Sequence, residues 1–182
     1  MTGLPEKIVA IAESLRDADI PYAFGGALAL AWCTQRARGT IDIDVNVFAH
    51  VDRASETFMA LPEGVVWSSE DVACAASDGQ VRLWWDSTPV DVFFNTTEFH
   101  EEAAMRVHSE EFVGHRVPFL GCTDLAVFKA LFDRTQDWAD LEQMAQLGTL
   151  DFDRLVGVLV RYLGPSDERI DRIRALGSPD SD

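Results

Sequence analysis

The chain has few positive charges. Its 182 residues include 15 lysines and arginines against 31 aspartates and glutamates, which gives a formal net charge of −16. A protein this acidic is not expected to hold nucleic acid through a broad basic face, because most of its surface repels phosphate. A polyanionic partner would have to be bound by local groups of cations. Lysine occurs at two positions, Lys7 and Lys129, and the arginines that are grouped in sequence are Arg36 with Arg38, and Arg169 with Arg172 and Arg174.

Long apolar runs are also missing. The longest mostly apolar stretch, residues 22–33, is interrupted by two glycines and is shorter than the roughly 20 residues that span a bilayer. The beginning of the chain, MTGLPEKIVA, has no basic segment followed by an apolar one, so we expect no export signal. These features predict a cytoplasmic protein that does not enter a membrane.

Cysteine and histidine are scarce. Cys33, Cys74 and Cys122 lie far apart in the sequence and form no C-x-x-C pair, which predicts reduced thiols of the kind found in the cytoplasm. The four histidines show no metal-ligand spacing, so a zinc site is not expected.

Apolar residues make up 47% of the chain, which is enough for one domain with a core and a helical appendage. Helices and strands alternate in the first two thirds. The patterns predict helices over 4–18, 27–33, 51–61 and 98–107, strands over 20–24, 39–48, 65–67, 81–85 and 90–94, and a hairpin over 110–121. Helices are then predicted over 123–134, 137–147, 151–163 and 167–176. We therefore predict an α+β core over residues 1–121, a C-terminal helical region over 122–177 and a disordered tail over 178–182.

The strand GTIDIDVNVF, residues 39–48, carries two carboxylates where apolar residues would be usual. Isoleucine or valine stands at every odd position from 41 to 47, so a period of two places Asp42, Asp44 and Asn46 together on the other face. At the usual strand rise the Cα atoms of Asp42 and Asp44 lie about 6.5 to 7 Å apart. Both side chains could therefore reach one cation.

Two other interpretations of this strand compete with a metal site. An edge strand with a solvated acidic face is common in acidic proteins. An EF-hand loop matches at its first, third and fifth positions, but its sixth position requires glycine and is Val47, and its twelfth requires glutamate and is Arg53. The EF-hand is therefore excluded, whereas the solvated face stays open.

Two further features could complete a site. Gly25-Gly26 stands at a strand-to-helix turn, where backbone N–H groups can approach a phosphate, although such a pair is also common in plain tight turns. Asp91 interrupts a later strand, PVDVFF, in the same way as the first two carboxylates. Three strand carboxylates could hold two Mg²⁺ or Mn²⁺ ions about 3.5 to 4 Å apart, which would activate a hydroxyl and neutralise a triphosphate.

This combination resembles the nucleotidyltransferase superfamily that shares the DNA polymerase β type of fold. Its pattern is a glycine pair, a strand with D-x-D and a later strand with a third aspartate, here Gly25-Gly26, Asp42-Ile-Asp44 and Asp91. The resemblance implies a small mixed sheet with flanking helices, followed by a C-terminal helical bundle. It also implies that Asp42, Asp44 and Asp91 are metal ligands and that Asp91 is the general base. Many members have Gly-Ser where this chain has Gly-Gly.

A narrower resemblance rests on RGTIDID, residues 38–44, and FKALFDRTQDWADL, residues 128–141, which are similar to motifs of AbiEii-type toxins of type IV toxin–antitoxin systems. It implies that NMP is transferred from an NTP to the 3′ end of a tRNA, and that a cognate antitoxin exists. It further implies a catalytic contact of Lys129 with the triphosphate. The nucleotide-binding residues that it implies are Gly25, Gly26, Arg38, Thr40, Lys129 and Arg134, supported by Asp137 and Asp140.

The residues around Lys129 allow a structural alternative. On a helix Lys129 faces Asp133 one turn later, so the two could form an ordinary surface ion pair. However, Lys129 lies in the otherwise apolar run LAVFKALF, where a cation that faces a cleft would need a negative partner such as a triphosphate.

Two other functions stay open. An antibiotic nucleotidyltransferase of the aminoglycoside or lincosamide kind would suit an acidic surface, because such drugs are cationic. A catalytically inactive family member could act as a binding module, but clustered like charges cost stability and an inactive site gains nothing from keeping them.

Overall fold

The computed structural model describes residues 3–36 and 39–178. The chain divides into two compact units, one within residues 1–28 and 38–120 and the other within 29–37 and 121–182. The division between residues 120 and 121 falls one residue before the boundary that was predicted after residue 121. The segment that begins at residue 29 belongs to the same unit as the C-terminal helices, which the sequence did not predict. Of the predicted disordered tail, Ser178 is described and the rest lies outside the described residues.

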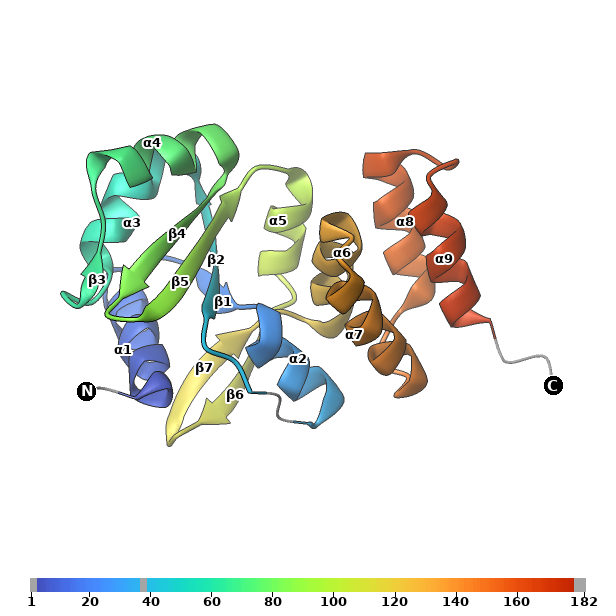
Figure 1. Ribbon diagram of the computed structural model, residues 1–182, viewed down its shortest axis with the longest axis horizontal. Helices are drawn as coiled ribbons and strands as arrows, with labels where there is room; N and C mark the ends of the chain where they lie inside the picture. The colour runs from blue at the N-terminus through green and yellow to red at the C-terminus, as the bar shows by residue number, and fades with distance from the viewer. Residues whose placement is uncertain (1–2, 37–38, 179–182) are drawn as a thin grey trace. The chain divides into compact units, whose positions relative to one another are not determined.

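The first unit is built on a mixed sheet. Its strands are β1 (Tyr22–Phe24), β2 (Ile43–His50), β3 (Val65–Val66), β4 (Gln80–Trp85), β5 (Thr88–Asn95), β6 (His108–Phe112) and β7 (His115–Phe119). Within the described part of the chain they form one seven-stranded sheet in the order β3-β4-β5-β2-β1-β7-β6 (Figure 1). β2 is parallel to β5 and β1 is parallel to β7, whereas the other neighbours are antiparallel. The predicted mixed sheet of an α+β protein is confirmed.

The helices of the first unit flank this sheet. They are α1 (Leu4–Asp17), α3 (Ala54–Ala60) after a 3₁₀ turn η1 (Val51–Arg53), α4 (Ser69–Asp78) and α5 (Glu98–Ala104), and α2 (Gly26–Thr34) begins in this unit. Helix α4 is absent from the sequence-based prediction, because SEDVACAASD has no stripe of large apolar residues. A capping box between Ser68 and Asp71 begins it, and Gly79, with a φ of 71°, ends it.

Apolar and polar side chains alternate along β2 and β5, which separates a core face of the sheet from a polar face. Ile43, Val45 and Val47 of β2 are buried, and Phe94 of β5 packs against Phe58 of α3 with ring centroids 5.9 Å apart. Asp44 and Asp91 point to the other face, as predicted from the period of two. The predicted start of the strand was wrong, however: β2 begins at Ile43, so Asp42 immediately precedes it.

The second unit is helical. Its helices are α6 (Cys122–Phe132), α7 (Thr135–Gln146), α8 (Phe152–Leu163) and α9 (Glu168–Gly177), close to the predicted ranges. No helix in residues 3–36 or 39–178 is long and apolar enough to cross a membrane.

The prediction of three reduced thiols is wrong for two of them. Cys33 of α2 and Cys122 of α6 form a disulfide with a Cα–Cα distance of 5.6 Å, and Cys74 is free and exposed. The pair is 89 residues apart in sequence, so spacing rules for nearby cysteines could not reveal it.

Candidate active site

The sheet register brings two of the predicted carboxylates side by side. Asp44 of β2 lies directly opposite Asp91 of β5 in a parallel pair, so both side chains share one face and their strands are about 4.8 Å apart. Asp42 precedes Asp44 by two residues. In the antiparallel pair of β4 and β5, Arg82 lies opposite Asp91. Arg82, Asp91 and Asp44 therefore form a row across three neighbouring strands.

Asp42 and Asp91 accept hydrogen bonds from neighbouring side chains. The Thr40 hydroxyl donates a hydrogen bond to Asp42, and Asp91 accepts hydrogen bonds from Arg82 at 2.7 Å (Nε to Oδ1) and 2.6 Å (Nη2 to Oδ2). These bonds and the negative charge of Asp91, with smaller contributions from Asp42 and Asp44, raise the pKa of Arg82 above its usual value. Among the described residues, no three histidine, cysteine or acidic side chains are gathered as a ready metal site. The oxygen donors and their backbone positions suit Mg²⁺, but Asp42 and Asp91 would have to turn from these partners.

The glycine turn lies against the carboxylate face. The Gly25 N–H donates to the Asp44 carbonyl at 2.9 Å, and a Cβ on Gly25 would come within 2.7 Å of Asn46 Nδ2. Gly26 has a φ of 50°, and a Cβ there would come within 1.8 Å of Asp44 Oδ2. The start of α2 can therefore approach Asp44 only because both residues lack a side chain.

We expect Gly26→Ala to destabilise the protein more than Gly114→Ala. Both glycines have positive φ, which costs an L-residue roughly 1 to 2 kcal/mol, but a Cβ on Gly114 would meet nothing within 4 Å. At Gly26 the Asp44 carboxylate must also move. Urea unfolding of both variants measures the difference, and equal losses would contradict the close approach.

The predicted residues around Lys129 come together within the second unit. Lys129 is 6% exposed, and its Nζ lies 2.6 Å from Asp140 Oδ2 and 3.2 Å from Asp137 Oδ1. Arg134 Nε lies 2.6 Å from Asp137 Oδ2. Burial alone would raise the pKa of Asp137, but the hydrogen bond from Arg134 and the charge of Lys129 lower it below its usual value. These four residues form what we call the Lys129 cluster.

The alternative of a surface pair between Lys129 and Asp133 is wrong. Asp133 ends α6 in a left-handed conformation, with a φ of 57°, and its carboxylate accepts a hydrogen bond from Trp138 Nε1 at 2.6 Å. Helical spacing from Lys129 therefore does not apply to Asp133. The contact of Lys129 with a triphosphate stays a prediction, as does that of Thr40. Arg38 lies outside the described residues.

No family model matches the chain, and no curated protein matches it. Three solved structures are similar to it over most of their length. ANT(2″)-Ia in complex with adenylyl-2″-tobramycin has a TM-score of 0.55 and 16% identity, with 96% of each chain covered. The solution structure of the antibiotic-resistance factor ANT(2″)-Ia has a TM-score of 0.50 and 14% identity, with 94% of this chain and 89% of that chain covered. An antigenic nucleotidyltransferase-like protein from Paracoccidioides brasiliensis has a TM-score of 0.50 and 15% identity, with 91% of each covered. The chain has a nucleotidyltransferase fold.

Within this nucleotidyltransferase fold, Arg82 is a candidate site residue that was not predicted from the sequence. The predicted strands 81–85 and 90–94 leave a four-residue connection, and a hairpin closed on those ends would pair Arg82 with Phe93. In the structure β5 begins at Thr88, so the turn is two residues long and its register sets Arg82 opposite Asp91.

Proposed function

We propose that this protein is a nucleotidyltransferase that moves NMP from an NTP to an acceptor hydroxyl and releases pyrophosphate. The observation that carries the proposal is the pairing in register of Asp44 with Asp91, with Asp42 two residues before Asp44. The Gly25-Gly26 turn, which packs against Asp44, supports it because helix starts commonly bind phosphate. The shared fold with known nucleotidyltransferases agrees with this assignment.

In the proposed reaction the acceptor oxygen forms a bond to the α-phosphorus while the bond from that phosphorus to the bridging oxygen breaks. Asp91 takes the proton of the acceptor hydroxyl. Asp42, Asp44 and Asp91 would hold Mg²⁺ or Mn²⁺, which when bound neutralises charge on the triphosphate and lowers the pKa of the attacking hydroxyl. The backbone N–H groups at the start of α2 would orient phosphate oxygens.

We assign the Lys129 cluster to the triphosphate as well, on the resemblance of residues 128–141 to the toxins. Within the cluster Arg134 has the more accessible cation, since its side chain is 70% exposed and that of Lys129 is 7% exposed. Asp137 and Asp140 would orient the two cations. The proposal therefore assigns a phosphate contact to Arg134 as well as to Lys129.

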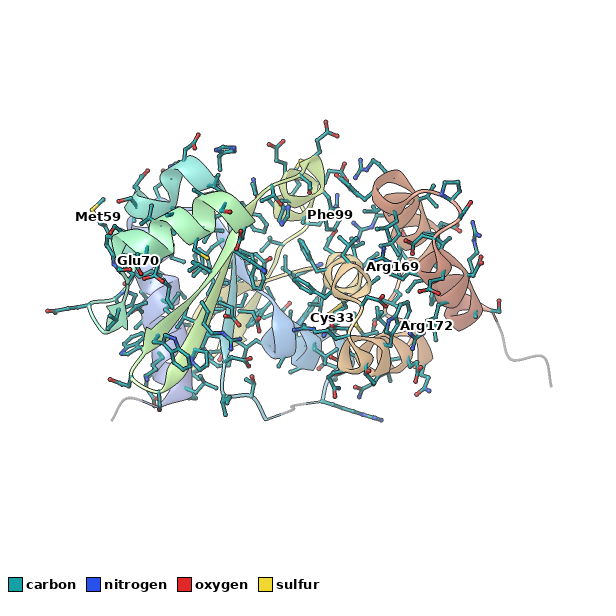
Figure 2. The ribbon with its side chains drawn as sticks, turned by 45° about the horizontal axis from the view of Figure 1, so that its top comes forward. Cys33, Met59, Glu70, Phe99, Arg169 and Arg172 are labelled. Carbon is teal, nitrogen blue, oxygen red and sulfur yellow. A yellow bond between two sulfur atoms is a disulfide. The ribbon has the colours of Figure 1, made fainter. Side chains whose placement is uncertain are left out.

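For the acceptor we propose the 3′ end of a tRNA, in a toxin that has a cognate antitoxin. Trp84 supports a nucleic-acid acceptor, because it is 48% exposed and shares a face of β4 with Arg82, where a base could stack on it. The arginines of α9, of which Figure 2 labels Arg169 and Arg172, support it less than their number suggests. Arg169 is bonded to both carboxylate oxygens of Asp167, and the Arg172 guanidinium lies 3.8 Å from the ring centroid of Trp138.

A cationic antibiotic is the second candidate acceptor. The net charge of −16 favours it, because an acidic surface attracts an aminoglycoside and repels RNA. The similarity to ANT(2″)-Ia, which was solved with adenylyl-2″-tobramycin, points the same way.

We also propose a cytoplasmic location. The Cys33–Cys122 disulfide counts against it, since disulfides are rare in that compartment.

One labelling experiment tests these assignments. The purified protein is given each α-labelled NTP with Mg²⁺ or Mn²⁺, and is offered total tRNA, a panel of aminoglycosides and lincosamides, or no acceptor. We expect label in tRNA, lost on chelation and absent with Asp44→Asn. Label in a drug instead would replace the tRNA assignment. If no label is transferred to any acceptor, the proposed enzymatic activity is wrong and the catalytically inactive binding module is favoured.

A further inference from the structure

Arg82 holds the third carboxylate of the site by both oxygens. Its Nε and Nη2 lie 2.7 and 2.6 Å from Asp91 Oδ1 and Oδ2, a two-point geometry that is among the stronger ion-pair arrangements. The Asp91 side chain is 15% exposed, whereas that of Arg82 is 52% exposed. Most of the Asp91 side chain is therefore inaccessible to solvent, whereas about half of the Arg82 side chain is accessible.

The charges of the other two carboxylates also favour the charged form of Arg82, which lies in one row with Asp91 and Asp44. The negative charges of Asp42 and Asp44 both act on the Arg82 guanidinium. Three like charges close together repel one another, and a cation among them relieves that repulsion. Arg82 thus supplies positive charge where a divalent cation would otherwise do so.

We propose that Arg82 is a latch on the active site: it occupies Asp91 in the nucleotide-free protein and must release it before Asp91 can bind a metal ion or accept a proton. This inference rests on the proposed function, because it assigns Asp91 to the metal. Arg82 acts through Asp91, so it is a positioning residue. Once Arg82 releases Asp91, that carboxylate would be able to hold a divalent cation, and the Arg82 guanidinium would be able to contact phosphate.

The Arg82 side chain is 52% exposed, so its ion pair with Asp91 is too accessible to water for stability to be its only role. An ion pair with an exposed partner contributes little to stability, so Arg82→Gln should fold. The chain offers a matched control on its surface. Arg53 forms an equally close two-point pair with Glu56, at 2.8 and 2.7 Å, outside the row of site residues.

The test is Mn²⁺ binding to the nucleotide-free protein, measured by electron paramagnetic resonance of free Mn²⁺. Arg82→Gln should bind Mn²⁺ about tenfold tighter than the unaltered protein, because a competing cation has been removed from an acidic site. Arg53→Gln should bind it as the unaltered protein does. In Arg82→Gln with Asp91→Asn the gain should disappear, since it depends on the freed carboxylate. Arg82→Lys, which keeps the charge but loses the two-point contact, should fall between the two.

The possible failures are distinguishable. Unchanged or weaker Mn²⁺ binding by Arg82→Gln would overturn the latch and leave the proposed function standing. Mn²⁺ binding by none of these proteins would overturn the metal site, and the latch with it. Equal tightening in Arg53→Gln would show a general effect of net charge and would also overturn the latch.

Discussion

Replacement of Asp44 with asparagine is expected to lower the rate of nucleotidyl transfer by about 1,000-fold or more, because removal of a metal ligand forfeits several kcal/mol of transition-state stabilisation. The melting temperature should stay the same or rise, since the change relieves repulsion among Asp42, Asp44 and Asp91. Asp42→Asn should behave in the same way. Turnover of labelled NTP and thermal unfolding measure the two effects.

Asp52→Asn is the matched control for this prediction. Asp52 lies two residues after the end of β2, and its side chain is 85% exposed. Its Oδ2 lies 3.0 Å from His50 Nδ1. The same chemical change there should leave transfer unaltered. If Asp44→Asn turned over as fast as Asp52→Asn, the assignment of the carboxylates to a metal site would be wrong.

Lys129→Met is expected to reduce the free energy of unfolding by about 3 to 5 kcal/mol, because it removes one partner of a buried ion pair. Asp140 would lose its contact at 2.6 Å, whereas Asp137 would keep Arg134. Urea unfolding at neutral pH measures the loss. A loss under about 1 kcal/mol, the value of an exposed pair, would show that the ammonium is not held as described.

The double variant Lys129→Met with Asp140→Asn separates stability from catalysis. It also removes the buried negative charge that Lys129 had neutralised, so most of the lost stability should return. If Lys129 also contacts the triphosphate, transfer should stay about 100-fold or more below that of the unaltered protein. Recovery of transfer together with stability would make Lys129 a structural residue and leave the phosphate contact to Arg134.

Local patterns in the sequence predicted much of the site. The period of two along residues 43–47 placed Asp44 on the polar face, because adjacent side chains of a strand point in opposite directions, whereas Ile41, which is 77% exposed, and Asp42 precede the strand. Gly25-Gly26 marked a close approach, since only glycine tolerates both the positive φ at Gly26 and the contact with Asp44. The helices after residue 121 followed from apolar spacing, which is also a local property.

The tertiary structure alone decided which groups are partners. Strand order placed β2 beside β5, and the register of the β4–β5 hairpin then set Arg82 on Asp91. The end of α6 at Asp133 turned the chain, so Lys129 bonds to two residues of α7 instead.

The pairing of Cys33 with Cys122 likewise depends on the packing of segments 89 residues apart. The sequence by itself therefore determined the types of element, the acidic face and the glycine turn, since each depends on neighbouring residues. Ion pairs and the disulfide depend on distances between separate elements. Those distances are fixed only when the core packs.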